Sequence, residues 1–434
     1  MYSKKHLSFT AIRTMIADNL ETIKDTRAAN NSNSIVDVML SGLACMYFQS
    51  DSLLEFQRNM ERKTQRNNLR SMFKVQDLPS DQGMKNIIDT VDTQTAFRPI
   101  FRKLFSQLQR GKHLEQYQTL PGKYLLNVDG TQYFSSKDVN CKKCLVRGTK
   151  KSQYNCHQAL QGAIVKAGLR QVIPVMPEEI CTQDGENKED CEVNAFKRFI
   201  EKFRKDHAKL GVIINADALY ATTPVINKIH ELNGNYILRV KSTQHKTLIN
   251  NISSANKTKV YATSRRNNEL VIEWVKDIEL FSSTKQRTNY IEAREVVLQK
   301  DGTKKVQYLG QWITDLEITS KNAQIILDAA RARWKIENEC FNSLKNHGYN
   351  MTHSYGHGSE NLCFNFYNFI LLAFTMHQIH QLTDKLFQEL RSQYSRLGSL
   401  WEQMLGVISF FYFTSMEVLW EFMAQKKDYQ PPPV

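Results

Sequence analysis

The chain has 434 residues, with 58 Lys and Arg against 44 Asp and Glu, and a formal net charge of +14 at pH 7. Hydrophobic residues make up 41% of it and there are only 9 Pro and 18 Gly, so the composition excludes a disordered or collagen-like chain. The positive surplus predicts a polyanionic partner, for which nucleic acid ranks before an anionic membrane.

The opening residues 1–11 contain no long apolar stretch, so no secretory signal is expected there. Eight cysteines in such a chain indicate reduced thiols in the cytoplasm. The most apolar stretch, residues 362–382, is interrupted by polar side chains, which are Asn365, Asn368, His377 and His380. These favour a buried helix over a membrane span, and we expect no membrane partner.

Residues 1–118 are expected to form a helical DNA-binding domain. Apolar side chains recur three or four residues apart over 12–23 and again over 35–46, which is the spacing of one helix face. A polar, basic stretch follows, and a solvated helix face explains any single basic residue in it equally well. The residues that we expect to contact DNA are Arg62, Lys63 and Arg66.

Residues 119–243 alternate predicted strands and helices, which indicates the first part of a mixed α/β core. The apolar runs 124–128 and 211–216 are typical of buried strands. Between them, residues 189–210 carry apolar side chains at helical spacing, which predicts an amphipathic helix.

Residues 244–321 have the pattern of short strands joined by polar turns, and they predict a β-rich insertion. Between residues 236 and 310 there are 14 Lys and Arg against 7 Asp and Glu, so half of the net charge lies in this part of the chain. Residues 322–385 are expected to form the helical last part of the core, and 386–434 a C-terminal helical region.

Two aspartates stand at the ends of apolar runs. Asp129 ends YLLNVD and Asp217 ends GVIINAD, so each carboxylate is expected where a rigid strand ends. A carboxylate in such a place costs free energy unless it is paired or binds a cation. Two of them on neighbouring strands repel each other, and a divalent metal removes that repulsion. Alternatively, each aspartate caps a turn or the next helix.

A third acid is expected on a helix over residues 330–346. Arg333 and Glu337 lie four residues apart and therefore share one helix face. Taken alone, this spacing is explained equally well by a surface ion pair. Glu339 is the alternative acid, but two residues along a helix it lies on nearly the opposite face from Glu337.

The motifs NVDGT, INADALYA and RWKIEN…FNSLK together resemble those of the bacterial insertion-sequence DDE transposases of the "IS four" type, the cut-and-paste group. The resemblance runs from about Lys123 to Leu362. That family's late signature is Tyr, two residues, Arg, three residues, Glu, six residues, Lys. Here Ala330 stands at the Tyr position, and seven residues separate Glu337 from Lys345. In a regular helix this spacing places Lys345 about 80° from Glu337.

The resemblance implies an RNase H-like α/β core with a β-rich insertion and flanking helical N- and C-terminal regions. It also implies that Asp129, Asp217 and Glu337 are catalytic and bind two Mg²⁺ or Mn²⁺ ions, which activate water or a DNA 3′-OH and stabilise the leaving oxygen. The implied partner is double-stranded DNA, as the inverted-repeat ends of a transposon and as target, with a homodimer assembled on it. Arg333 is the expected phosphate contact, and Lys345 is a further candidate. Apart from the resemblance, Lys241 is a candidate DNA contact near Asp217, and placement on the surface explains it equally well.

A zinc site is a second expectation. Cys141 and Cys144 have the C-x2-C spacing of a zinc knuckle, and two more ligands are sought among Cys156, His157 and Cys191. Because neighbours on a strand face opposite sides, Cys156 and His157 are not expected to bind together. This leaves Cys191 with either Cys156 or His157, and the set that we predict is Cys141, Cys144, His157 and Cys191. Free thiols on a basic hairpin or a redox pair are the alternatives.

The function that we expect is that of a metal-dependent DDE transposase. A catalytically inactive or domesticated DNA-binding regulator is one alternative, favoured by the missing Tyr and the shifted Lys345. The intact acidic trio argues against it. Another RNase H-like nuclease is the second alternative, and joining of 3′ ends to target DNA distinguishes it from a transposase.

Overall fold

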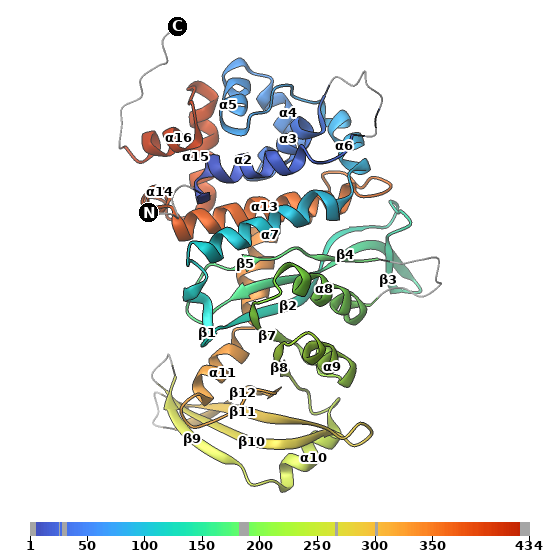
Figure 1. Cartoon of the computed structure of the whole chain (residues 1–434), viewed down its shortest axis with the longest axis vertical. Coiled ribbons are helices and arrows are strands. Elements are labelled where there is room, and N and C mark those ends of the chain that lie inside the picture. Colours follow the sequence, from blue (N-terminus) through green and yellow to red (C-terminus); the bar gives the residue numbers. More distant parts are fainter. Residues whose placement is uncertain are drawn as a thin grey trace.

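The computed structural model describes residues 6–25, 27, 33–181, 191–264, 268–299 and 303–425. Within these ranges, helices stack on a mixed twelve-stranded sheet (Figure 1). The N-terminal helices lie at one end of the molecule, and the long strands of residues 244–321, here called the basic segment, lie at the other. The main strand order is β3-β4-β2-β7-β8-β12-β11-β10-β9, while β1 pairs with β2, and β5 and β6 pair with β4. The chain is therefore a mixed α/β protein, as its alternating pattern predicts.

The first described helices lie before residue 111, and most begin at a local cap. Their bounds are α2 (Phe9–Leu20), α3 (Ile35–Tyr47), α4 (Leu53–Met60), α5 (Lys63–Phe73), α6 (Asp81–Thr90) and α7 (Thr93–Arg110). A side-chain oxygen of the residue before the helix accepts a backbone N–H three residues on, at Ser8, Ser34, Ser52, Ser80 and Asp92. Capping residues therefore set where these predicted helices start.

The strands that position the acids form the middle of the sheet. Their bounds are β1 (Gln118–Leu120), β2 (Lys123–Ser136), β3 (Leu145–Thr149), β4 (Ser152–Val165), β5 (Ile173–Pro174), β6 (Glu178–Ile180), β7 (Gly211–Ala216) and β8 (Asn235–Arg239). Strand β2 runs antiparallel to β4 and parallel to β7, and β7 runs parallel to β8. Short helices η1 (Glu115–Tyr117) and η2 (Ala218–Tyr220) and helices α8 (Glu192–Asp206) and α9 (Thr223–Glu231) complete this part.

The basic segment extends the same sheet. It contains α10 (Lys246–Ser254), β9 (Thr258–Thr263), β10 (Glu269–Phe281), β11 (Gln286–Leu298) and β12 (Lys304–Thr314). The end of β12 pairs antiparallel with β8, where Trp312 faces Arg239 and Thr314 faces Ile237. Some of its charges are paired on the sheet, as in Lys259 with Glu273 at 2.9 Å, so they are not all available to a partner.

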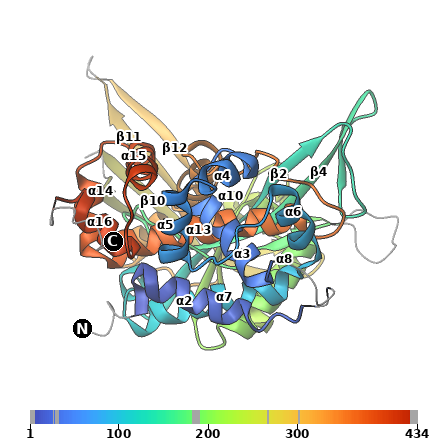
Figure 2. The same ribbon diagram turned by 90° about the horizontal axis from the view of Figure 1, so that it is seen from above.

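The remaining helices follow β12. They are α11 (Ala323–Arg331), the π-helical segment η3 (Ile336–Phe341), α12 (Asn342–Asn346), α13 (Leu362–Thr383), α14 (Lys385–Ser392), α15 (Leu397–Phe410) and α16 (Met416–Met423). Helix α13 contacts α3, α6 and α7, and it crosses beneath the N-terminal helices in the view from above (Figure 2). Among the described helices it alone is long and apolar enough to cross a membrane, and its apolar window is wholly buried in the protein. The predicted buried helix is thus confirmed.

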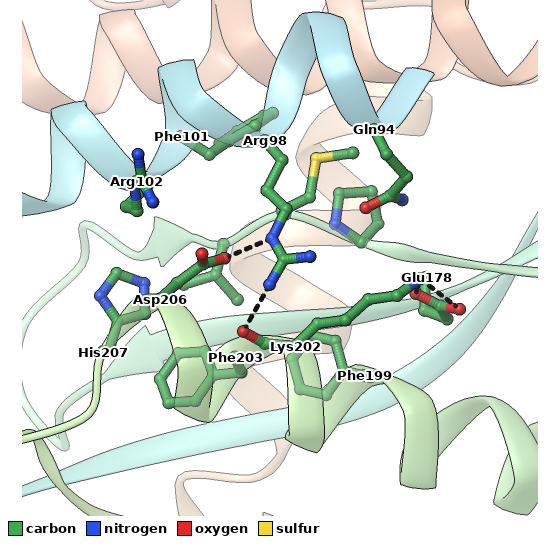
Figure 3. Close-up of a pocket in the computed structure, with 13 residues that line it drawn as sticks. Gln94, Arg98, Phe101, Arg102, Glu178, Phe199, Lys202, Phe203, Asp206 and His207 are labelled. Atoms are coloured by element: carbon green, nitrogen blue, oxygen red, sulfur yellow. Dashed lines mark hydrogen bonds and ion pairs between the residues drawn. The ribbon is translucent and has the colours of Figure 1, made fainter. Parts of the chain in front are cut away.

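An ion-pair network joins the N-terminal helices to the core. Arg98 on α7 lies 2.8 Å from Asp206 at the end of α8 and donates to the Lys202 carbonyl oxygen at 2.9 Å (Figure 3). Lys202 in turn lies 2.7 Å from Glu178 on β6. Arg98 therefore fastens α7 to α8, and these paired charges line a small pocket between the two helices.

Candidate active site

Two neighbouring parallel strands carry the first two acids. Asp217 directly follows β7, as expected, whereas Asp129 lies in the middle of β2, which continues to Ser136, so the prediction that a strand ends at Asp129 was wrong. The register pairs Asn127 with Asn215, so each aspartate stands two residues beyond the same level of the sheet. The Oδ1 atom of Asp217 also accepts the Leu219 N–H at 2.8 Å, so this residue caps η2 in addition.

Two buried asparagines link these strands to the segment that carries the third acid. Asn127 and Asn215 are both 0% exposed. The Asn127 amide donates to the carbonyl oxygens of Ala332 at 2.7 Å and Arg333 at 3.2 Å. The Asn215 amide donates to Asn127 Oδ1 at 3.1 Å and to the Ala329 carbonyl oxygen at 2.9 Å. Buried amides of this kind are costly to leave unpaired, so they hold the end of α11 at a defined place on the sheet.

Arg333 stands between the first and the third acid. Its Nη1 atom lies 3.4 Å from Asp129 Oδ2 and 2.6 Å from Glu337 Oε1. The Arg333 side chain is only 16% exposed, whereas that of Glu337 is 47% exposed. The pair predicted by the four-residue spacing is therefore not an isolated surface ion pair, because its arginine also contacts a strand carboxylate.

Negative charge is concentrated at this place. Burial raises the pKa of Asp129 to about 7; the charge of Arg333 opposes the rise, and the charges of Glu192, Glu337 and Asp217 add to it. The pKa of Asp129 thus responds to both other predicted acids, which places all three in one electrostatic neighbourhood. A cation bound beside a partly buried carboxyl with a raised pKa would favour its carboxylate form.

A fourth carboxyl belongs to the same neighbourhood, and the sequence pattern did not single it out. Glu192 is the first residue of α8, and its Oε1 atom accepts the Tyr220 hydroxyl at 2.5 Å. Burial, reinforced by the charge of Asp217, raises the pKa of Glu192. Its Oε2 atom lies 2.5 Å from where a Cβ would stand at Gly130. The glycine after Asp129 was the available signal, since it leaves room for this carboxylate.

The predicted continuous helix over 330–346 is interrupted. Helix α11 ends at Arg331, and η3 is π-helical before α12 begins. A π turn holds one residue more than an α turn, so it absorbs the extra residue between Glu337 and Lys345. Lys345 lies within electrostatic range of Asp129: burial lowers the pKa of Lys345, and the charge of Asp129 opposes that lowering.

The other predicted residues are exposed or half-buried. Glu339, the alternative third acid, stands 3.7 Å from Lys335. Lys241 is exposed just after β8. The basic residues of α5, which packs on α3, α4 and α15 at the top of Figure 1, are also exposed. These residues are Arg62, Lys63 and Arg66.

Three of the four predicted zinc ligands lie together at a separate place. Cys141, Cys144 and His157 form a group with His357, in which all the ligand atoms are within 4.8 Å of one another. Cys191 is not part of this group; it is exposed and precedes α8. His357 is 200 residues from His157, so no local spacing could mark it as a member.

The donor set of the acidic neighbourhood fits a divalent cation. Its members are all carboxylates, which suit hard ions such as Mg²⁺ and Mn²⁺. Four carboxyls gather near two cationic side chains, Arg333 and Lys345, and the pKa of Asp129 is raised first by burial and further by the charges of the other three acids. A cation held there would relieve the repulsion that the fold imposes on these groups.

Comparison with protein families matches residues 145–373 to the transposase DDE domain. The matched range includes Asp217 and Glu337 and begins after Asp129. No curated protein matches the chain. Among solved structures, the NurA nuclease from Sulfolobus solfataricus aligns at 10% identity over 69% of this chain and 98% of that chain, with a TM-score of 0.20. Nothing about fold or function follows from so low a TM-score.

The DDE domain match implies DNA binding, divalent-metal use and phosphoryl transfer of the transposition type. It covers more than half of the 434 residues. The chain therefore belongs to the transposases with a DDE domain.

Proposed function

We propose that the protein cuts the ends of its own mobile element and joins them to target DNA, in the cut-and-paste manner of the "IS four" insertion sequences. The observation that carries this proposal is the gathering of Asp129, Asp217 and Glu337 in one electrostatic neighbourhood of a DDE-domain protein. The strand arrangement of β4, β2, β7 and β8 supports an RNase H-like core as well. We also propose division of the chain near residues 118, 243, 321 and 385, and action in the cytoplasm.

The three acids are the proposed ligands of two Mg²⁺ or Mn²⁺ ions. When bound there, such ions would activate the attacking oxygen and stabilise the leaving oxygen of an in-line phosphoryl transfer. The chain's own part is to hold the carboxylates in place on rigid strands and on η3. Glu192 lies close enough to act on Asp129 and is a candidate fourth carboxylate at the site.

Arg333 has two proposed roles. In the protein without DNA, its guanidinium pairs with Asp129 and Glu337 and so reduces the repulsion between them. When DNA is bound, the same planar group suits a phosphate oxygen pair next to the scissile bond. Lys345, on the Asp129 side of α12, is the proposed second phosphate contact, and its partial burial strengthens that contact.

DNA beyond the site is proposed to lie on exposed basic surfaces, where contacts to phosphates are salt-dependent and independent of sequence. Candidates are Lys241 after β8 and the basic residues of α5. A homodimer assembled on the two element ends is part of the proposal, because both ends must be processed together.

The test uses the DNA that flanks the gene, cut to include its terminal inverted repeats. Asp129→Asn, Asp217→Asn and Glu337→Gln are each expected to lower strand cleavage in Mg²⁺ by about 10³-fold, equivalent to about 4 kcal/mol of transition-state stabilisation. End binding, measured by gel shift, should stay within about threefold of wild type. Glu339→Gln is the matched control and should cleave normally.

Cleavage by a protein with all three substitutions would overturn the assignment. Cleavage without joining of 3′ ends to target DNA would instead favour another RNase H-like nuclease. Specific end binding by the wild type with no cleavage in either metal would favour an inactive DNA-binding regulator.

A further inference from the structure

Four side chains outside the acidic site point at one centre. They are Cys141 and Cys144, which precede β3, His157 on β4, and His357 in the loop before α13. The two Sγ atoms are 3.9 Å apart, and each lies 3.4–3.5 Å from His157 Nε2. His357 Nε2 lies 3.4 Å from Cys144 Sγ and 3.1 Å from His157 Nε2.

These separations are those of the edges of a coordination tetrahedron. With Zn–S near 2.3 Å and Zn–N near 2.0–2.1 Å, tetrahedral geometry requires about 3.8 Å between two sulfurs, about 3.6 Å between sulfur and nitrogen, and about 3.3 Å between two nitrogens. The observed distances differ from these by about 0.2 Å. Hydrogen bonding among the four groups does not explain the arrangement equally well, because two imidazole Nε2 atoms and two thiols cannot all donate to one another.

The surroundings orient both imidazoles for ligation through Nε2. His357 Nδ1 lies 2.8 Å from the Gly358 carbonyl oxygen, to which it can only donate, so its Nε2 is left with a lone pair. His157 is 2% exposed, and its Nδ1 lies 3.7 Å from Glu179 Oε1. A backbone carbonyl or a carboxylate behind a ligating histidine is the usual support of a metal site.

We propose that Cys141, Cys144, His157 and His357 bind one Zn²⁺ ion as a structural site. Two thiolates and two imidazoles suit zinc and not the hard cations of the acidic site. Four protein ligands fill the tetrahedron and leave no position for a water or substrate, so the site is structural and not catalytic.

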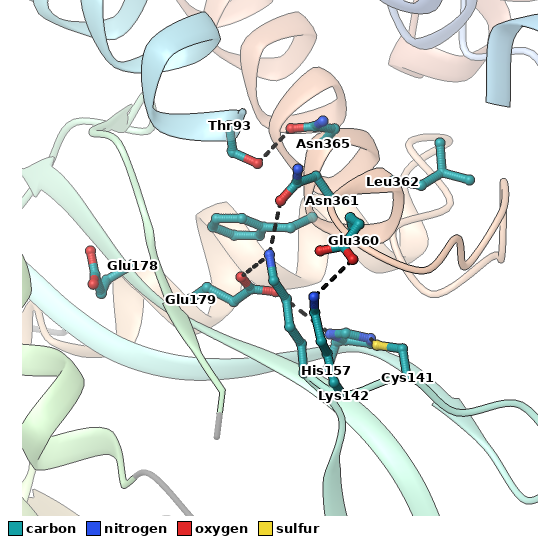
Figure 4. Close-up of polar contacts among 12 residues, drawn as sticks. Thr93, Cys141, Lys142, His157, Glu178, Glu179, Glu360, Asn361, Leu362 and Asn365 are labelled. Carbon is teal, nitrogen blue, oxygen red and sulfur yellow. Dashed lines mark hydrogen bonds and ion pairs between the residues drawn. The ribbon is translucent and has the colours of Figure 1, made fainter. Parts of the chain in front are cut away.

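The ion would fasten the β3–β4 hairpin to the loop before α13, and direct contacts follow the same path. Lys142 lies 2.8 Å from Glu360 (Figure 4), and Lys143 donates to Asn361 at 2.8 Å. The loop itself is held by Asp89 of α6, which accepts the backbone N–H groups of residues 359–362. Zinc therefore completes a connection from the hairpin of the sheet to the N-terminal helices.

This connection gives the zinc a specific effect on DNA binding. The hairpin ends in the exposed pair Lys150 and Lys151, at the turn between β3 and β4. Without zinc, only the contacts of Lys142 and Lys143 would hold the hairpin to this loop, so its basic tip would be less well ordered before DNA arrives. Ordering it in advance lowers the entropic cost of binding.

The test begins with the full-length protein, purified from zinc-supplemented medium without a metal-affinity tag and analysed by plasma mass spectrometry. We expect about one zinc per chain. Replacing the zinc by Co²⁺ should give the visible absorption of a tetrahedral site with two thiolate ligands. His357→Ala and Cys144→Ser should weaken zinc binding by more than about 100-fold, since even changes behind the ligands cost 10–100-fold.

Cys191→Ser and His353→Ala, which alter an exposed cysteine and an exposed histidine outside the group, are the matched controls and should keep one zinc. Limited proteolysis of the wild type, with and without a zinc chelator in excess Mg²⁺, should show cleavage near residues 137–151 only when zinc is removed. This readout does not depend on whether a variant folds.

Three results would overturn the proposal. These are zinc well below one per chain after remetallation, a Co²⁺ spectrum without thiolate absorption, and zinc loss in Cys191→Ser but not in His357→Ala. None of them bears on catalysis by the three acids, so failure of this proposal leaves the proposed transposase function standing, and the reverse also holds.

Discussion

Replacing the buried asparagines beside the acids should lower both the stability of the fold and the cleavage activity. Asn127→Ala removes the hydrogen bonds to Ala332 and Arg333 and the one received from Asn215. At about 0.5–1.5 kcal/mol each, these three bonds amount to about 1.5–4.5 kcal/mol of unfolding free energy. Asn215→Ala removes two bonds and should cost about 1–3 kcal/mol. Because the two amides bond to each other, the double variant should lose less than the sum.

Cleavage activity should fall by more than the loss of folded protein explains. The same hydrogen bonds hold Arg333 and Glu337 against the strands, and a displacement of about 1 Å in an active site costs on the order of 100-fold in rate. The assay measures urea unfolding in parallel with cleavage of element ends at a low temperature, where the folded fraction of each variant is determined by circular dichroism.

Asn365 supplies the matched control. It is also 0% exposed and makes three hydrogen bonds, to Thr93 at 2.6 Å and to the carbonyl oxygens of Ile88 at 2.8 Å and Val91 at 2.9 Å. Asn365→Ala should lose similar stability but cleave within about threefold of wild type. If Asn127→Ala and Asn365→Ala cleave equally per folded molecule, the amides serve stability alone and the reasoning is refuted.

Three further predictions concern single positions. Gly130→Ala should displace the Glu192 carboxylate and lower cleavage with little loss of stability; unchanged cleavage would exclude Glu192 from the site. Burial lowers the pKa of His380 to about 3, so the unfolded chain alone takes up its proton below about pH 6.5. Unfolding free energy should therefore fall by about 2 kcal/mol from pH 7.5 to 5 because of His380. This pH-dependent loss should vanish in His380→Leu but remain in the exposed control His347→Leu. Equal pH dependence of the two variants would contradict the prediction. Deleting the exposed Asn338 should convert η3 to a regular α-helix and keep end binding. If the deletion abolishes folding, the interpretation of η3 as an α-helix with one inserted residue is wrong.

The features that could be predicted from the sequence are those that depend on the local pattern of apolar and polar residues. Asp129 and Asp217 follow apolar runs, and strands form over both runs, but β2 continues past Asp129 to Ser136. The sequence pattern also marks Asn127 and Asn215. Each is an amide inside an apolar run, two residues before the acid and hence on the same strand face. The extra residue before Lys345 was likewise visible as spacing, but only the structure shows that a π turn absorbs it.

Partners that meet only in the folded chain could not be predicted. His357 joins Cys141 and Cys144 through tertiary packing across more than 200 residues, and no periodicity connects them. Glu192 begins a helix whose pattern describes its buried apolar face and says nothing of its first carboxylate. Spacing identifies residues that share an element, whereas the membership of a site depends on how elements pack.

The position of α13 has a consequence for how the protein is made. Its side chains fill the space beneath α3, α6 and α7, although more than 300 residues of chain separate the end of α3 from Leu362. At about 5–20 residues per second, the ribosome delivers α13 roughly 15–60 s after α3. During that interval α3 can already pack against α2, α5 and α6, but the side chains that face α13 lack their final partner. The N-terminal helices therefore complete their native packing only when most of the chain has been synthesised.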